Sequence, residues 1–232
     1  TDRRHEMVAE NLANLQMPGY RRRIVSQSNF DTLLRPLRQS TDGVDSSKLL
    51  GATADPARYD FSQGNIQDTK RQLDVALNGD GFFTVQGSSG PLYTRSGAFH
   101  LDPQGTLVTQ DGLSVLGQGG SIQVPGGVTE SQVEIAADGS VFAGDQQIGQ
   151  LALTRFADNS VLTAVGASLF AAGSNAVPTA TSAEVLQGRL EMANTSSVTE
   201  LINLISISRH RDAAQKALNA IADTIQKRIG LR

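Results

Sequence analysis

The sequence of 232 residues contains no cysteine and no tryptophan, and aromatic residues make up only 5% of it. Without cysteine, disulfides, thiolate metal sites and thiol nucleophiles are excluded. With so few aromatic side chains, a stacking platform for carbohydrate lacks material. The composition therefore predicts neither a cofactor nor a small-molecule substrate that depends on these side chains.

An excess of one charge is also lacking, because 20 basic residues face 23 acidic ones and the net charge is -3. Such a balance creates no general field that would attract nucleic acid or an anionic membrane. No apolar run reaches 18 residues, so membrane insertion is not expected. The N-terminus lacks the basic, apolar and small-residue order of a cleaved signal peptide. A helical pattern is already under way at Thr1, so we expect that helix to begin before this residue.

Residue patterns for catalysis and metal binding are missing as well. The three histidines are far apart and none begins a metal-ligand spacing: His5, His100 and His210. The glycine-rich segment 117–120 is followed by neither a helical pattern nor a lysine, so it lacks the features of a phosphate-binding loop. Ser114 misses the spacing of a nucleophile elbow by one residue. We therefore expect no enzyme activity.

What the sequence does contain is a long helical pattern at its end, over residues 197–229. Apolar residues recur there on one stripe, interrupted by Arg211: Leu204, Ile207, Ala214, Leu218, Ile221, Ile225 and Ile229. The first half adds apolar residues on other faces: Val198, Leu201, Ile202 and Ile205. Ser197 and Glu200 have the spacing of a capping box. The pattern predicts an amphipathic helix that needs a covering partner.

A second helical pattern covers residues 1–16 and ends at Pro18 and Gly19. Its apolar residues include Val8, Leu12 and Leu15. The basic residues 21–23 that follow are expected to face a helix C-terminus rather than nucleic acid, because no aromatics are interleaved. Residues 29–37 predict a short helix, and the polar, small residues 39–57 predict a linker.

Between the two ends, hydrophobic residues recur with a period of two, as in Leu73, Val75 and Leu77. Turn signals interrupt this pattern about every 8 to 15 residues without helical stretches between them, which favours an antiparallel β-domain. The expected fold is α+β: an antiparallel all-β central domain flanked by N- and C-terminal helices that pack together. The predicted divisions are 1–38 helical, 39–58 linker, 59–190 β-rich and 191–232 helical.

Three short motifs also stand in order along the chain. The first consists of Asn11, Leu12, Ala13, Asn14, Pro18, Gly19, Tyr20 and Arg21. The second comprises 63–65, 73–85 with Gly79, Asp80, Gly81, Phe82 and Phe83, then 93–97, Phe99, Gly105, 107–109 and Gly112. The third comprises Gln187, Gly188, Leu190, Glu191, Asn194, Val198, Glu200, Ile205, Arg209, Lys216 and Ala217. Together they resemble the N-terminal, central and C-terminal signatures of the bacterial flagellar rod and hook family.

The resemblance implies a non-enzymatic subunit whose terminal helices form an inner domain around a channel, with the β-rich domain outside. Family members assemble with copies of themselves and with other rod subunits into the periplasm-spanning rod of the basal body, which transmits torque to the hook. They are exported by the flagellar type III apparatus without a cleaved signal peptide. The residues expected to pack in assembly are Val8, Leu12, Leu15, Val198, Leu201, Leu204, Ile205, Leu218, Ile221 and Ile225.

Within this family the chain is too short for the large extra domain of hook proteins, so a rod protein is indicated. Residues 117–125 and 134–139 resemble a proximal rod protein, and the stretch 30–63 lacks the longer insertion typical of distal rod subunits. The distal type is the alternative. Residues 208–212 depart from the family pattern, because they keep its arginine and lack its glutamine and aromatic residue. A different class of function, a secreted β-domain that binds a partner without polymerising, would need the β-region alone.

Overall fold

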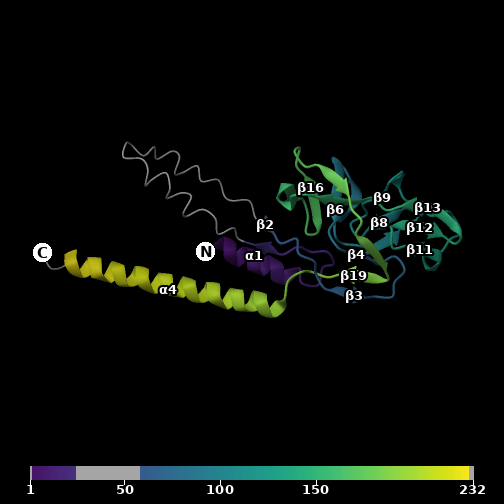
Figure 1. Cartoon of the computed structure of the whole chain (residues 1–232). Coiled ribbons are helices and arrows are strands. Elements are labelled where there is room, and N and C mark those ends of the chain that lie inside the picture. Colours follow the sequence, from purple (N-terminus) through teal and green to yellow (C-terminus); the bar gives the residue numbers. More distant parts are fainter. Residues whose placement is uncertain (1, 25–57, 230–232) are drawn as a thin grey trace.

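The computed structural model describes residues 2–24 and 58–229, and it consists of a β-body with two helices beside one end of it (Figure 1). The short helix predicted at 29–37 and the linker predicted at 39–57 lie outside the described residues. The first and last described segments therefore meet at the same end of the molecule, and the strands between them make up the rest.

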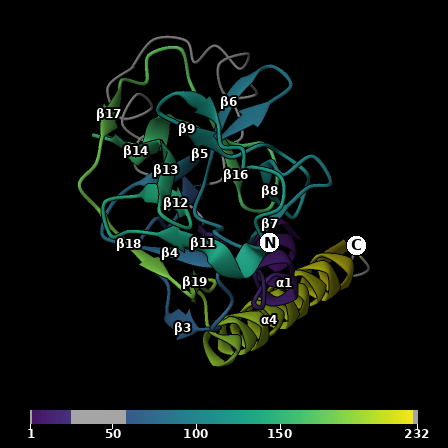
Figure 2. The same ribbon diagram turned by 90° about the vertical axis from the view of Figure 1, so that its right-hand side faces the viewer.

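The described helices are α1 (Asp2–Ala13) and α4 (Ser197–Ile229). They run antiparallel and contact each other, and both views show α1 beside the first part of α4 (Figures 1 and 2). With a rise of 1.5 Å per residue, α4 is about 50 Å long and α1 about 18 Å. Most of α4 therefore extends beyond α1. Neither of these helices is long and apolar enough to cross a membrane.

The largest sheet of the β-body has six strands, in an order that is not their order along the chain. From edge to edge these are β15 (Leu162–Ala164), β16 (Leu169–Ala172), β6 (Gly90–Thr94), β5 (Phe82–Gly87), β14 (Leu153–Phe156) and β17 (Pro178–Ala180). Strands β5 and β6 form a hairpin at its centre, with Val85 opposite Leu92. The antiparallel pairing predicted from the alternating pattern is confirmed in this sheet.

Smaller antiparallel sheets complete the body. One has three strands: β11 (Val133–Ile135), β12 (Ser140–Ala143) and β13 (Gln146–Gln150). The two-stranded sheets are β1 (Arg23–Ile24) with β2 (Arg58–Tyr59), β3 (Ile66–Asp68) with β19 (Arg189–Glu191), β4 (Val75–Asn78) with β18 (Glu184–Gln187), β7 (Phe99–Leu101) with β8 (Leu107–Thr109), and β9 (Leu116–Gly117) with β10 (Gly120–Ser121). Single 3-10 turns lie at Glu130–Gln132 and Asn159–Val161. Strands β3 and β19 bring the two ends of the β-region together.

Two hydrophobic clusters fill the β-body, and β5 contributes to both. Phe83 and Val85 belong to the larger cluster, where the ring of Phe83 meets Phe99 edge-on at a centroid distance of 5.2 Å. Phe82 points to the opposite side of the strand and belongs to an aromatic cluster with Tyr93, Phe156 and Phe170. The alternation of side chains along a strand thus links the two clusters.

The predicted alternation is incomplete at one segment. Leu73, Val75 and Leu77 are buried as the period of two predicts, but the intervening Asp74 and Ala76 are buried as well. Other parts of the chain cover both faces of this segment, so it lacks the solvent-facing side that strict alternation implies. The segment leading into β4 is therefore at the centre of the body rather than on its surface.

Candidate functional site

The segments that connect the helices to the β-body run side by side. Residues 14–22 follow α1, and residues 192–196 precede α4. The backbone N–H of Gly19 donates to the carbonyl of Glu191 at 2.7 Å, and that of Asn194 donates to the carbonyl of Tyr20. We call this meeting place the junction and define it by Asn11, Tyr20, Arg21, Arg22, Arg95, Glu191, Asn194 and Glu200.

Glycines allow the backbone segments of the junction to approach closely. Gly19 has a φ of +70°, and a Cβ atom there would lie 2.2 Å from the backbone nitrogen of Ser96. A Cβ atom at Gly64 would lie 2.1 Å from the carbonyl oxygen of Met192. Real Cβ atoms do not come this close, so a larger residue at either position would push the segments apart.

At the centre of the junction is the carboxylate of Glu191, which is fully buried. Its Oε1 accepts from Arg21 Nη2 at 2.7 Å and from the backbone N–H of Gly64 at 2.8 Å, and its Oε2 accepts from Arg95 Nη1 at 3.1 Å. Arg21 is fully buried as well, and Arg95 is 3% exposed. Removing one partner of a buried ion pair leaves an uncompensated charge, so these three side chains depend on one another.

Arg95 connects this carboxylate to the β-body. Its Nη2 donates to the carbonyl of Gly79 at 2.6 Å, and its guanidinium lies over the ring of Phe82. Burial lowers the pKa of Arg95 from its ordinary value, and the charge of Glu191 opposes that shift. Arg95 thus ties the central motif to Glu191 of the C-terminal motif, and Glu191 in turn binds Arg21 of the N-terminal motif.

A second buried carboxylate, Glu200, lies in the first turn of α4. Its Oε1 accepts from Arg22 Nε at 2.6 Å and from Thr195 Oγ1 at 3.0 Å. A negative charge in the first turn also interacts favourably with the helix dipole, which is positive at this end. The capping box predicted from Ser197 and Glu200 is wrong, because Ser197 is the first residue of the helix and the carboxylate of Glu200 accepts from Arg22 and from Thr195.

Two asparagines satisfy the backbone around these ion pairs. Asn194 accepts from the N–H of Arg22 at 2.7 Å, and its Nδ2 donates to the carbonyls of Asp60 and Ser62. The side chain of Asn194 therefore joins the segment before α4 to Arg22 and to residues 60–62.

Asn11 performs the same task at the end of α1. It accepts from the N–H of Arg23 at 2.9 Å and donates to the carbonyl of the same residue at 3.0 Å. The hydroxyl of Tyr20 also donates to Asn11, at 3.0 Å. Burial, with a smaller contribution from the charge of Glu10, raises the pKa of Tyr20 to about 12. Tyr20 therefore stays protonated as a hydrogen-bond donor.

The basic run 21–23 differs from its prediction. We expected it to face a helix C-terminus, but each arginine is paired with a carboxylate: Arg21 with Glu191, Arg22 with Glu200 and Arg23 with Glu10. Arg21 and Glu191 are 170 residues apart in the sequence. Local periodicity cannot identify such a pair, although a charged residue inside a Gly- and aromatic-rich motif is a signal of burial with a partner.

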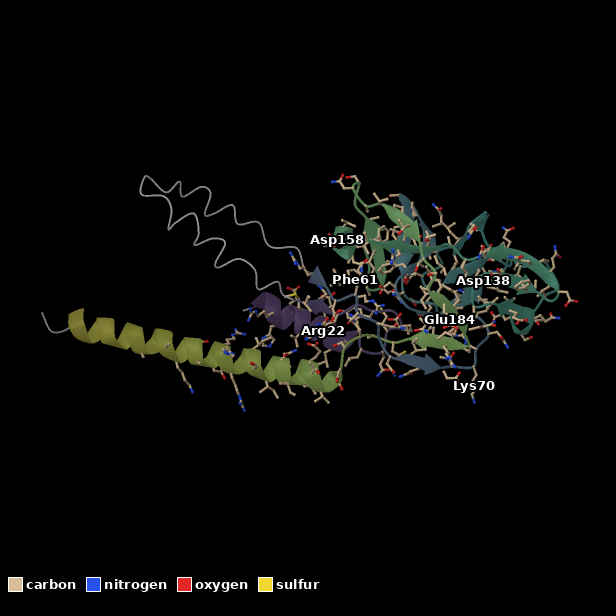
Figure 3. The ribbon with its side chains drawn as sticks, in the orientation of Figure 1. Arg22, Phe61, Lys70, Asp138, Asp158 and Glu184 are labelled. Carbon is tan, nitrogen blue, oxygen red and sulfur yellow. The ribbon has the colours of Figure 1, made fainter. Side chains whose placement is uncertain are left out.

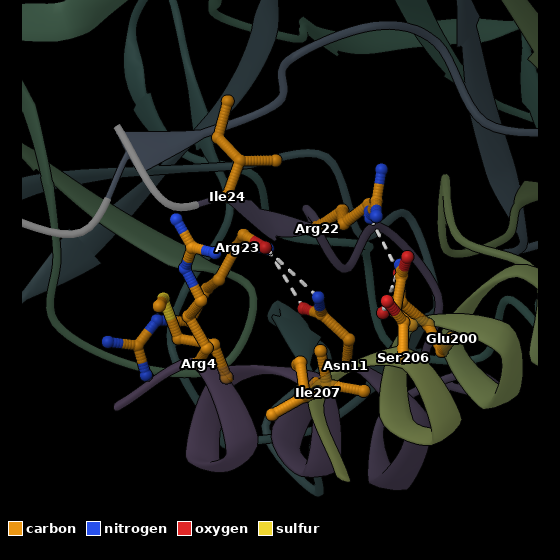
Figure 4. Close-up of a pocket in the computed structure, with 11 residues that line it drawn as sticks. Arg4, Asn11, Arg22, Arg23, Ile24, Glu200, Ser206 and Ile207 are labelled. Carbon is orange, nitrogen blue, oxygen red and sulfur yellow. Dashed lines mark hydrogen bonds and ion pairs between the residues drawn. The ribbon is translucent and has the colours of Figure 1, made fainter. Parts of the chain in front are cut away.

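Between α1, α4 and β1 lies a cavity of about 320 Å³. Figure 4 shows Arg22 bonded to Glu200 and Asn11 bonded to Arg23 along its wall. Figure 3 places Arg22 between the helices and the β-body, whereas Asp138, Asp158 and Glu184 lie away from it on the β-body. Within residues 2–24 and 58–229, no group of three or more His, Asp or Glu side chains could hold a metal ion. The junction is suited to fixing the positions of chain segments.

The residues predicted to pack in assembly have different environments. Val8 is buried, while Leu12, Leu15 and Leu204 are half-buried. Val198, Leu201 and Ile205 are exposed. The side chains of Leu218, Ile221 and Ile225 lie outside the described part of the chain. Arg211, which the predicted stripe includes, is exposed. The role of these residues in assembly stays a prediction.

The family-motif residues are divided between the junction and the β-body. Asn11, Gly19, Tyr20, Glu191 and Asn194 meet at the junction, as described above. In the β-body, Gly81, Phe82 and Phe83 are buried, and Gly79 and Asp80 form the exposed turn before β5. Outside both places, Ala13 is exposed, and Leu12, Asn14 and Gly188 are half-buried. The motifs name Arg21, Arg95 and Glu200 without indicating that these residues carry the ion pairs.

Comparison with known families gives two matches. The flagellar hook protein FlgE/F/G D1 domain matches residues 76–143, which begin in β4 and end with β12. The flagellar basal body rod FlgEFG protein C-terminal family matches residues 186–231, which include Glu191, Asn194 and α4. The first segment contains Arg95 and the second contains Glu191, so the two matches include both members of this ion pair.

Similar proteins extend over nearly the whole chain. The flagellar basal-body rod protein FlgF of Caulobacter vibrioides is 33% identical over 219 residues, covering 94% of this chain and 87% of that protein. FlgG of Buchnera aphidicola from Acyrthosiphon pisum is 32% identical over 244 residues, covering 95% and 91%. FlgF of Salmonella typhimurium is 32% identical over 233 residues, covering 93% and 86%. The chain belongs to the flagellar basal-body rod protein family.

Proposed function

We propose that this chain is a structural subunit of the bacterial flagellar rod, which polymerises through its terminal helices into the shaft that transmits torque to the hook. The observation that carries the proposal is the junction. It joins motif residues from both ends of the chain through buried ion pairs and holds α1 and α4 antiparallel at one end of the β-body. A subunit of a rotating shaft needs such a fixed connection between its assembling part and its outer part.

This arrangement assigns a role to each segment of the chain. Residues 1–38 and 191–232 supply the inner helical domain, 39–58 the linker and 59–190 the outer β-rich domain. The contact between α1 and α4 supports an inner domain built from both ends of the chain. The residues that pack between subunits are those predicted from the helical stripes, including Val198, Leu201 and Ile205, whose exposure leaves them available. Its partners are copies of itself and other rod subunits, and it needs no catalytic group.

Assembly of the full-length chain tests this function. Mixed with neighbouring rod subunits, the full chain is expected to form fast-sedimenting particles that negative-stain microscopy shows as short tubes. A variant lacking residues 197–232 is expected to stay monomeric while its β-body remains folded by circular dichroism. A secreted binding module would keep its function after this deletion. Failure of the full chain to assemble with its neighbours under any condition would contradict the proposal.

The position in the rod and the route to it are finer parts of the proposal. We assign the chain to the proximal rod, which residues 117–125 and 134–139 support. Basal bodies from cells lacking this protein are then expected to lack the distal rod. We also assign export to the flagellar type III apparatus, without a cleaved signal peptide. Absence of the protein from the periplasm and basal bodies of an export mutant, and an intact N-terminus in the exported protein, would support this route.

A further inference from the structure

The start of α4 has two faces of different character. Glu200, Asn203 and Ile207 line the cavity against α1. On roughly the opposite side, at 100° per residue, Val198, Leu201, Ile202 and Ile205 lie together and are exposed by 65%, 45%, 60% and 53%. We call these four residues and Arg209, the next exposed residue on this face, the α4 ridge. A group of branched apolar side chains exposed together marks an interaction site.

The outer face of α1 carries small side chains, in contrast to the large apolar side chains of the α4 ridge. Arg4, Met7, Val8 and Asn11 face the cavity, so the other side of the helix carries Ala9 and Ala13, which are exposed. The same side continues to Glu6 at one end and, beyond the helix, to Met17, which is 36% exposed. We call Glu6, Ala9, Ala13 and Met17 the α1 trough. Its small alanine side chains leave room for large side chains from another helix.

Ridge and trough match in length and in charge. Ile202 and Arg209 are 7 positions apart along α4, as are Ala13 and Glu6 along α1. In an antiparallel pairing, Ile202 lies at the level of Ala13 and Arg209 at Glu6, Ile205 lies at Glu10, one position from Ala9, and Val198 lies past the end of α1, where Met17 follows. This pairing brings opposite charges together at one end, and neither charge takes part in an ion pair among the described residues.

The two surfaces cannot meet within one chain. α1 and α4 already contact each other through the faces that line the cavity. The ridge and the trough therefore lie on opposite outer sides of the helix pair. Copies in the same orientation present the trough of one antiparallel to the ridge of the next, because α1 and α4 are antiparallel within each copy (Figure 1). Such a contact joins different surfaces, and its repetition produces a ring or a helical filament.

We propose that the α4 ridge of one copy docks antiparallel into the α1 trough of the next copy, with Arg209 paired to Glu6. This inference rests on the proposed function, which requires subunit contacts but does not say which faces make them. It assigns the inner face of α4 to the subunit's own α1 and the outer face to the neighbour.

Cysteine pairs test the contact directly, because the chain has no cysteine of its own. Full-length Ala13→Cys and Ile202→Cys variants are mixed and oxidised, and a disulfide-linked dimer of the two is expected. A matched control uses Ser88→Cys, an exposed position in the β5–β6 turn, in place of Ala13→Cys. Linkage of Ile202→Cys mainly to itself, or equally to Ser88→Cys, would overturn the pairing.

Charge exchange gives a second measure, read as the concentration at which half of the chain sediments as assemblies. Glu6→Arg and Arg209→Glu are each expected to raise it about two- to fivefold, and the double variant to return it close to the original value. Val198→Ser is expected to raise it by at least about tenfold, whereas Val177→Ser, which changes a somewhat more exposed valine of the β-body, leaves it unchanged.

The outcomes separate this inference from the function on which it rests. If the parent chain assembles while the ridge and trough variants neither cross-link nor shift assembly, the subunit function stands and the assigned faces are wrong. If the parent chain fails to assemble with rod subunits under any condition, the proposed function fails and takes this contact with it.

Discussion

The β-body and the helical end of this protein bury their apolar residues in different ways. In the β-body, strand β5 sends Phe82 and Phe83 into two separate clusters, and both side chains are nearly inaccessible. In α4, the apolar residues at its start are exposed, and most of the helix extends past α1. Among the described residues, the β-body buries its apolar side chains within one chain, whereas the start of α4 leaves several of them exposed. The ion pairs of the junction mark the boundary between the two.

The largest expected effect concerns the β-body. Phe83→Ala removes a ring that is fully buried against Phe99, and it is expected to lower the free energy of unfolding by about 4 kcal/mol through lost burial and a residual cavity. Urea denaturation of the dilute monomer measures this change. A loss below about 1 kcal/mol would mean that the β-body is not the stable part of the molecule.

The junction is expected to be nearly as sensitive. Glu191→Gln keeps the size of the side chain but leaves Arg21 and Arg95 buried without a counter-charge, so the free energy of unfolding should fall by about 3 kcal/mol. The control is Glu184→Gln, an exposed carboxylate that accepts from Asn78 Nδ2 at 3.1 Å, and this change should matter by less than about 1 kcal/mol. Equal effects in the two variants would remove the distinction between the junction and the surface.

The hydroxyl of Tyr20 predicts a pH dependence at the same place. Because its pKa is about 12 in the folded chain and 10.0 ordinarily, the unfolded chain loses this proton first as pH rises. The contribution of this hydroxyl to the free energy of unfolding is therefore constant below pH 10. Between pH 10 and 12 it falls by on the order of 2 kcal/mol. Tyr20→Phe should reduce this slope, while burial also raises the pKa of Tyr59 and Tyr93, so part of the slope remains. Denaturation at several alkaline pH values checks this, and an unchanged slope would refute it.

The smallest effect is expected where the helical end is exposed. Val198→Ser should change the unfolding free energy of the dilute monomer by no more than about 0.5 kcal/mol, because the side chain is already in water. Val177→Ser on the β-body is the matched control. Thermal denaturation at low concentration measures both. A large destabilisation by Val198→Ser alone would show that this side chain is packed within the single chain, which would weaken the contrast between the two regions.

Much of the element order could be predicted from the sequence, because hydrophobic periodicity is local. The pattern over residues 197–229 predicted α4, and the alternation at Leu73, Val75 and Leu77 predicted buried residues of an antiparallel body. The same alternation did not predict that Asp74 and Ala76 are buried, since this depends on what covers the other face.

The sequence predicted which residues belong to the candidate site but not which of them contact one another. The motifs include Arg21, Arg95, Glu191 and Asn194, but no spacing in the sequence says that Glu191 pairs with Arg21 and Arg95 rather than with the neighbouring Arg189. The pairing is set by the close approach of backbones at Gly19 and by strands β3 and β19, which bring distant segments together. Ion pairs between such segments follow from the completed fold, so a local pattern cannot reveal them.

The separation of Arg21 and Glu191 by 170 residues also sets an order of events in folding. Contacts this far apart in the chain form late, because a large loop must close before they stabilise anything. A chain that emerges from a ribosome N-terminus first cannot complete the junction until its β-region has been made. Its helical end therefore gains a fixed position only when nearly the whole chain has emerged.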